Sequence, residues 1–260
     1  MRQWTVLYKK ELKEQWRSFK WLWVPLVFML LGMMQPVTAF YLPEIMEQFG
    51  GLPEGAVFDI PLPGGGQVIA ETLGQFSQIG TLILVLAFMG TIVNERVQGT
   101  WVMVLVKPVS YANFITAKWA GVATIVTVSY VLGLAAGIYY TVLLIESVPV
   151  GPVISGALIF LLWLLFLITL LLLFSSLFKS SAAVAFLTLG IAIVLSLISG
   201  VLPEFMEWSP GMLTSHSYEW LITGEPRDGL WLPVTVTAVL IACMISLSVY
   251  SVKRKEVISS

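Results

Sequence analysis

The sequence predicts an all-α integral membrane protein with six transmembrane helices, an N-terminal amphipathic interfacial helix, and a short cytoplasmic helix between spans 2 and 3. Hydrophobic residues make up 58% of the 260 residues and charged residues 11%, whereas a soluble domain carries about 25% charged residues. Six long stretches lack charged residues, and the charges between them are sorted by side. This composition excludes a soluble enzyme, a nucleic-acid binder or a disordered chain as an interpretation of the whole sequence.

The six apolar stretches are each close to the length of about 20 residues that a helix needs to cross the hydrocarbon core. Backbone groups in lipid have to be satisfied within the segment, so each stretch is predicted to be a helix. Together they define one transmembrane domain over residues 1–260. The predicted spans are 21–41, 75–93, 119–145, 152–174, 182–202 and 231–252.

The charges of the connecting segments predict the orientation of the chain. One set of segments holds 13 of the 14 basic residues: 1–20, 94–118, 175–181 and 253–260. The other set holds only Arg227 among the basic residues, together with 11 of the 15 acidic ones: 42–74, 146–151 and 203–230. Because positively charged loops stay in the cytoplasm, both termini are expected there, in a multi-pass membrane protein.

Residues 1–20 carry an apolar stripe beside a basic stripe, both at helical spacing. The apolar stripe consists of Trp4, Tyr8, Leu12, Trp16 and Phe19, and the basic one of Lys9, Lys13, Arg17 and Lys20. The pattern predicts a helix in the membrane interface, with aromatic rings at the acyl boundary and basic groups reaching the lipid headgroups. A plain positive-inside anchor with no further role is the simpler alternative.

Several kinds of chemistry are excluded or disfavoured by what the sequence lacks. No ionisable residue lies within a predicted span, which argues against an ion-coupled secondary transporter. Cys243 and His216 are single, so thiolate clusters and multi-histidine metal sites are excluded. Ten methionines suggest copper handling, but Met33-Met34 is their only cluster, and no bound metal is expected. No GxxxxGK[ST] motif is present, so the chain is expected not to be an ATPase.

Two groups of small or polar residues lie inside the predicted spans. Gly133 and Gly137 form a GxxxG pattern, which permits close helix packing. The outer start of the second span is polar, and its side chains either line a cavity or belong to a helix cap: Gln75, Ser77, Gln78 and Thr81.

The segment 94–118 is the most informative part of the sequence. Asn94 suits a helix N-cap and Glu95 the first turn, and Pro108 ends or redirects the helix. An apolar face follows, made of Trp101, Val102, Leu105 and Val106. Such a helix, placed outside the spans, favours docking into a groove of another protein. A re-entrant or interfacial helix without a partner is the alternative.

This segment resembles the first cytoplasmic loop of the membrane subunits of ABC-2 type ABC transporters. The matching elements, in order, are Glu95-Arg96, Gly99-Thr100, Lys107-Pro108-Val109-Ser110 and Lys118. The span count and the two long outer segments agree with the resemblance, which covers essentially the whole chain. In that family the loop forms a coupling helix that docks into the nucleotide-binding subunit. The resemblance therefore implies an ATPase contact at Glu95, Arg96, Gly99, Thr100 and Trp101.

The resemblance implies a permease subunit of an ATP-driven exporter in a bacterial or archaeal plasma membrane. A separate subunit would bind ATP-Mg, and this chain would bind no cofactor. The expected partners are that ATPase, membrane lipid and a second permease, either the same chain or a homologue, and no nucleic acid. A membrane scaffold or sensor, coupled to an ATPase without moving a solute, is the alternative function. Lipids, peptides, drugs and small ions all remain open as substrates.

Overall fold

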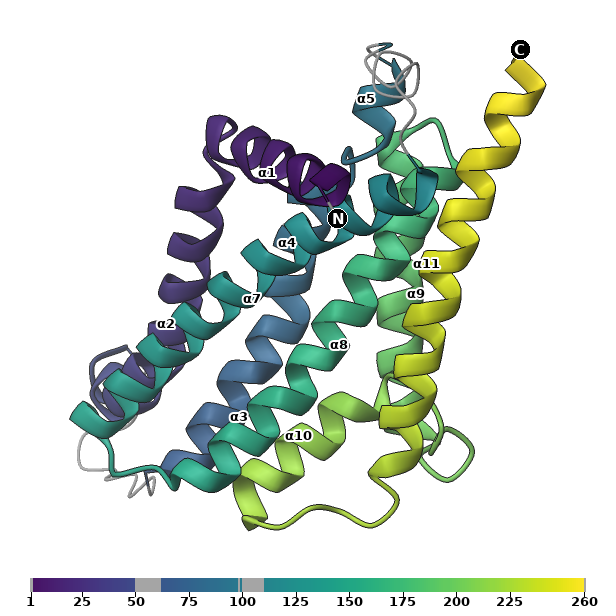
Figure 1. Cartoon of the computed structure of the whole chain (residues 1–260). Helices are drawn as coiled ribbons and strands as arrows, with labels where there is room; N and C mark the ends of the chain where they lie inside the picture. Colours follow the sequence, from purple (N-terminus) through teal and green to yellow (C-terminus); the bar gives the residue numbers. More distant parts are fainter. Residues whose placement is uncertain (1, 50–61, 98, 100–109, 260) are drawn as a thin grey trace.

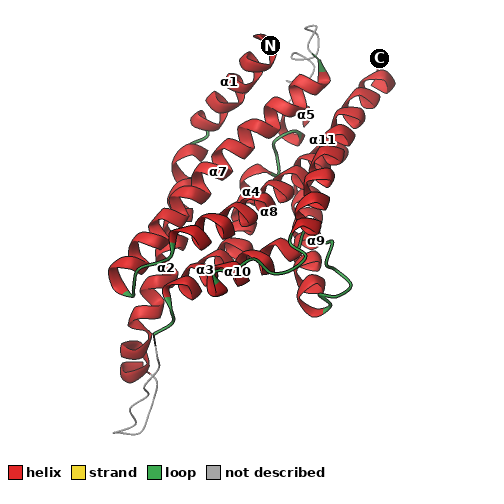
Figure 2. Cartoon of the chain, turned by 60° about the horizontal axis from the view of Figure 1, so that its bottom comes forward, coloured by secondary structure: helices red, strands yellow, loops and turns green. Residues whose placement is uncertain are grey.

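The computed structural model describes residues 2–49, 62–97, 99 and 110–259, and within these ranges the chain is helical without strands. Figure 2 shows the helices joined by loops. The elements in chain order are α1 (Arg2–Arg17), α2 (Lys20–Phe49), α3 (Gly65–Gln75), the π-helix η1 (Phe76–Gly80), α4 (Thr81–Phe88), α5 (Val93–Val97), α7 (Tyr111–Leu144), α8 (Val150–Leu177), α9 (Ser181–Val201), α10 (Met212–Thr223) and α11 (Trp231–Ser259).

Six helical stretches are long and apolar enough to cross a membrane, which confirms the predicted number. They are Lys20–Ile45, Gly65–Val97, Tyr111–Leu144, Val150–Leu177, Ser181–Val201 and Trp231–Arg254. The second comprises α3, η1, α4 and α5. Figure 1 shows both chain ends at the same end of the bundle as α5, with α10 at the opposite end. This placement agrees with an even number of crossings.

The crossing stretches are longer than the predicted spans and include charged residues that the predicted bounds left outside, so the expected absence of ionisable residues does not hold for the longer helices. The second crossing stretch begins at Gly65 and the third at Tyr111, so they include Glu71 and Lys118. Both side chains are neutralised or hydrogen-bonded locally. Glu71 accepts hydrogen bonds from Gln35 at 2.5 Å and from Gln67 at 2.9 Å, and Lys118 forms ion pairs with two glutamates. A helix can carry a charge when tertiary partners stabilise it.

Helix α8 lies at the centre of the bundle and is the most buried of the crossing helices. A row of aromatic rings connects it to α2, η1 and α7. The successive centroid distances are 5.1 Å for Phe28–Phe76, 6.0 Å for Phe76–Tyr130 and 5.6 Å for Tyr130–Phe160. The Tyr130 hydroxyl donates to the carbonyl oxygen of Ala157 at 3.0 Å, so its polar end is satisfied inside the core.

Helix α1 lies across the end of the bundle and packs on α7 (Figure 1). Trp4 Nε1 donates to Thr116 Oγ1 at 3.1 Å. The Tyr8 hydroxyl and Thr124 Oγ1 share a hydrogen bond of 2.8 Å. The prediction that the whole aromatic stripe faces lipid is therefore wrong for Trp4 and Tyr8. Farther along, Trp16 and Phe19 are exposed and remain available to the membrane interface.

The GxxxG pattern predicted for packing brings α7 against α2. Gly133 lies so close to α2 that an added Cβ would be 2.6 Å from the carbonyl oxygen of Phe28. At Gly137 an added Cβ would lie 3.1 Å from the carbonyl oxygen of Gly32. Because backbone atoms oppose both glycines, neither can accept a side chain without separating the two helices.

We predict that Gly133→Ala destabilises the bundle by about 1–3 kcal/mol, the usual cost of overpacking a core. Gly190→Ala is the matched control, because an added Cβ there meets no atom within 4 Å. Thermal unfolding of both variants in the same detergent measures the difference. An unchanged midpoint for Gly133→Ala would show that α2 and α7 do not pack this closely.

Candidate functional site at the junction of α1, α5 and α7

A buried lysine joins three helices at the end of the bundle that holds both termini. Lys118 lies two turns into α7, and its side chain is 1% exposed. Its Nζ atom is 3.0 Å from both carboxylate oxygens of Glu11 on α1. The same Nζ atom is 2.9 Å from Glu95 Oε1 on α5. One ammonium group therefore binds α1 and the start of the 94–118 segment to a crossing helix.

Lys10 completes this cluster from the rim. Its Nζ donates to Glu95 Oε1 at 2.8 Å and lies 3.8 Å from Glu14. Burial alone would lower the pKa of Lys10, but the hydrogen bond to Glu95 and the charges of Glu95, Glu11 and Glu14 raise it. Burial raises the pKa of Glu11, against the opposing charge of Lys118. The rim lysine thus stays charged beside its carboxylates.

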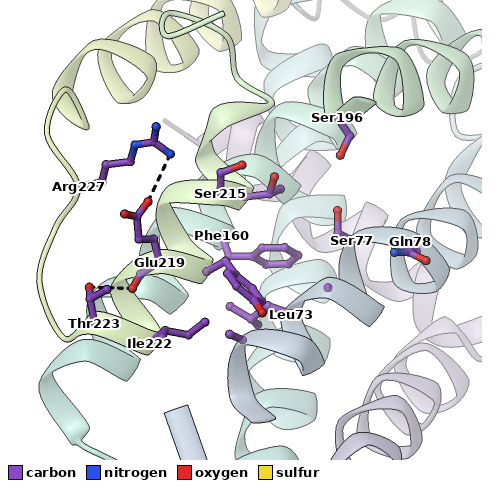
Figure 3. Close-up of a pocket in the computed structure, with 14 residues that line it drawn as sticks. Leu73, Ser77, Gln78, Phe160, Ser196, Ser215, Glu219, Ile222, Thr223 and Arg227 are labelled. Atoms are coloured by element: carbon purple, nitrogen blue, oxygen red, sulfur yellow. Dashed lines mark hydrogen bonds and ion pairs between the residues drawn. The ribbon is translucent and has the colours of Figure 1, made fainter. Parts of the chain in front are cut away.

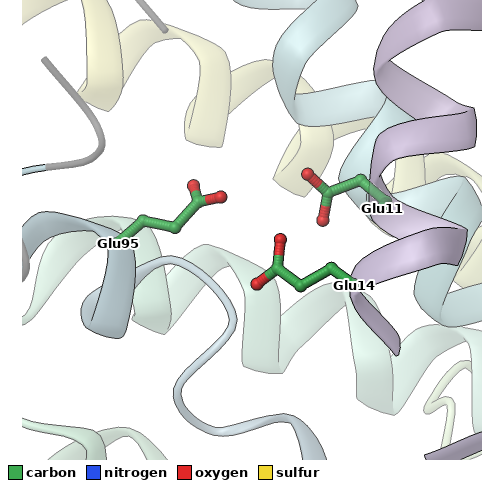
Figure 4. Close-up of side chains that lie close together, drawn as sticks. All are labelled: Glu11, Glu14 and Glu95. Carbon is green, nitrogen blue, oxygen red and sulfur yellow. The ribbon is translucent and has the colours of Figure 1, made fainter. Parts of the chain in front are cut away.

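Three carboxylates converge at this junction (Figure 4). Ligand oxygens of Glu11, Glu14 and Glu95 lie within 4.8 Å of one another, a spacing that a cation could bridge. The ammonium groups of Lys118 and Lys10 already form ion pairs with all three carboxylates. The arrangement is therefore an ionic junction between helices.

The short helix α5 is also attached to the end of α8. Arg96 donates to the carbonyl oxygens of Ser176 at 2.9 Å and Phe178 at 3.3 Å. The Ser175 hydroxyl accepts from the backbone N–H groups of Ile92 at 3.0 Å and Val93 at 3.3 Å. The last carbonyl groups of a helix lack intrahelical partners, and Arg96 satisfies two of them.

The structure separates the five residues predicted to contact an ATPase. Glu95 and Arg96 are directed toward the chain's own helices, so we expect them to position the loop. Gly99 is exposed and has a φ of 69°, a conformation that glycine adopts without strain. Thr100 and Trp101 lie outside the described residues. Docking at Gly99, Thr100 and Trp101 stays a prediction.

The partners of Glu95 were not predicted from the sequence. Lys118 was placed in a loop, and Glu11 was left out of the description of the amphipathic helix. One signal was present: Glu11 and Glu14 interrupt an otherwise basic N-terminal segment. Which basic residue pairs with these two glutamates depends on how α1 packs across α7. No local pattern in the sequence specifies that packing.

Comparison with known proteins shows which family the chain belongs to. Residues 5–209 match the family model described as ABC-2 family transporter protein. This chain belongs to the ABC-2 transporter family. It is also 31% identical over 254 residues to the uncharacterized transmembrane protein YxlG of Bacillus subtilis (strain 168), covering 98% of this chain and 97% of that protein. The resemblance seen in the 94–118 segment is thereby confirmed, and the protein is a multi-pass membrane component of a transporter.

We predict that Lys118→Met destabilises the protein by about 3–5 kcal/mol, because it removes the buried cation of Glu11 and Glu95 and leaves them only Lys10 at the rim. Arg227→Met is the control, since the pair of Arg227 and Glu219 is exposed and such pairs contribute about 0–1 kcal/mol. Limited proteolysis of α1, together with thermal unfolding, measures both effects. Equal behaviour of the two variants would contradict a stabilising role for the buried junction.

Proposed function

We propose that this chain is the permease subunit of an ATP-driven exporter and that a separate subunit binds and hydrolyses ATP-Mg. The observation that carries the proposal is the ionic junction, which ties the start of the predicted coupling segment to a crossing helix. Membership of the ABC-2 family supports the same function, since an ABC-type ATP-binding partner is the general rule in this family.

The junction offers a route by which movement of the docked loop would reach the membrane. A displacement of α5 acts on α7 through Glu95 and Lys118, and on α8 through Arg96. Helix α7 packs along α2, and α8 contacts α9, α10 and α11. Rigid, closely packed elements transmit small shifts because packed cores have low compressibility. A displacement of the loop thus reaches α7 and α2 on one side, and α8 with α9, α10 and α11 on the other.

The permease is proposed to work as a pair, either two copies of this chain or this chain with a homologue. A chain that couples an ATPase to an outer event without moving a solute is the competing function. ATP-driven movement of solute in sealed vesicles separates the two, because only an exporter changes the solute content of the lumen.

We predict that Trp101→Ala weakens association with the ATPase subunit about thirtyfold, equivalent to about 2 kcal/mol, because interface hot spots are often aromatic. Trp231→Ala is the matched control: Trp231 is an exposed tryptophan and the first residue of α11, far along that helix from the C-terminus. The measurement is co-purification of the ATPase from membranes, with its ATP turnover. If both variants retain the ATPase equally, residues 94–107 are not the dock.

We predict that both termini lie in the cytoplasm, because the segments on that side hold 13 of the 14 basic residues. Topology reporters fused after Ser260 and within residues 42–74 measure the two sides. After Ser260, a reporter enzyme that works only in the cytoplasm should be active. Within residues 42–74, a reporter enzyme that works only outside the cytoplasm should be active. The reverse pattern would overturn the orientation, and with it the side on which an ATPase can dock.

A further inference from the structure

The second crossing changes from α-helix to π-helix over Phe76–Gly80. The backbone N–H of Thr81 accordingly bonds to the carbonyl oxygen of Phe76, five residues earlier. Single π-turns inside α-helices occur frequently at functional sites. Sequence analysis left two roles open for Ser77 and Gln78, a cavity lining or a helix cap. The structure places both in the walls of two adjoining pockets.

The outer pocket has a volume of about 580 Å³ and lies between α3, η1, α8, α9 and α10. Figure 3 shows hydroxyl groups and one ion pair around it. Arg227 and Glu219 are 3.3 Å apart, and each is about two-fifths exposed, so both keep atoms free for a ligand. Among the described residues that line the outer pocket, the charged ones are the acidic Glu219 and the basic Arg227.

The inner pocket has a volume of about 410 Å³ and shares Ser77, Gln78 and Ser196 with the outer one. Its other walls are mostly aliphatic, and Trp163 of α8 contributes an aromatic wall. The exposed apolar residues of its lining, Leu82, Ile193 and Leu197, belong to crossing helices, so the pocket opens on the surface that faces the membrane. An occupant can therefore enter from the bilayer.

Two buried polar groups belong to residues that line the inner pocket and have no partner among the described residues: Trp163 Nε1 and Thr81 Oγ1. Thr72, Thr169 and Thr188 each donate to the carbonyl oxygen four residues earlier. Thr81 does not, and the turn before it is the π-turn. Buried polar groups are normally hydrogen-bonded. Both atoms lie within the wall of the pocket and not on its open surface, so an occupant could reach them only if the wall moved.

We propose that the two pockets form one groove for a zwitterionic, single-chain amphiphile of the lysophospholipid type. The opposed charges of Arg227 and Glu219 match a headgroup with one charge of each sign. The aliphatic inner pocket has room for one acyl chain, within the 300–1,000 Å³ range of small-molecule sites. As a substrate class, this inference rests on the proposed transport function.

The test is binding of lysophosphatidylcholine to the purified chain in nanodiscs, followed by native mass spectrometry without ATP or ATPase. Saturable binding is expected, and it should be at least about tenfold weaker in Ser196→Phe, which fills the shared part of the groove. Ser246→Phe is the matched control, since Ser246 is exposed on α11.

The comparison ligands decide the chemical class. Lysophosphatidylglycerol, with a net negative head, and a two-chain phosphatidylcholine should both bind at least about tenfold more weakly. Equal binding of either ligand overturns the proposed class, and unchanged binding by Ser196→Phe overturns the site. Because no ATPase is present, such a result leaves the permease proposal standing. Conversely, loss of the ATPase dock at Trp101 leaves the lipid measurement unaffected.

Discussion

The arrangement of this protein depends on the buried ammonium group of Lys118. A lysine that is 1% exposed is stable only if carboxylates compensate the loss of its hydration, and here they come from α1 and α5. Three segments, far apart in the sequence, must therefore meet before the charge can be buried. The same requirement places the start of the 94–118 segment against the membrane domain. It also holds α1 across the end of the bundle, where Trp4 and Tyr8 bond to α7.

Helix α8 connects the two regions to which we assign function. At one end its carbonyl groups accept from Arg96, beside the ionic junction. Farther along, Phe160 and Trp163 contribute to the outer and inner pockets. The helix is the most buried of the six crossing stretches, so it cannot shift without moving its neighbours. The transport function we propose uses this continuity: events at the loop and occupancy of the groove act on the same rigid element.

The sequence was sufficient for the all-helical class, the six crossings and the family, because hydropathy and charge sorting are properties of each segment alone. It was not sufficient to place Lys118 and Glu71 within crossing helices, because each charged residue was taken as the end of a span. Only the tertiary partners of these side chains show that a crossing helix can carry them. The contacts of Trp4 and Tyr8 with α7 were not predicted for a related reason: the apolar stripe of an amphipathic helix can face either lipid or protein. The π-turn at Phe76–Gly80 has no simple sequence signature, although the polar residues around it indicated that the segment was unusual.

The most direct test of this account is a double-mutant cycle between Glu95 and Lys118. The free energy of unfolding in one detergent is measured for Glu95→Gln, Lys118→Met and the double variant. If the ion pair holds the loop on α7, the double variant is less destabilised than the sum of the single variants, with a coupling of about 0.5–3 kcal/mol. Strict additivity of the two substitutions would show that the two charges do not depend on each other and would contradict the account.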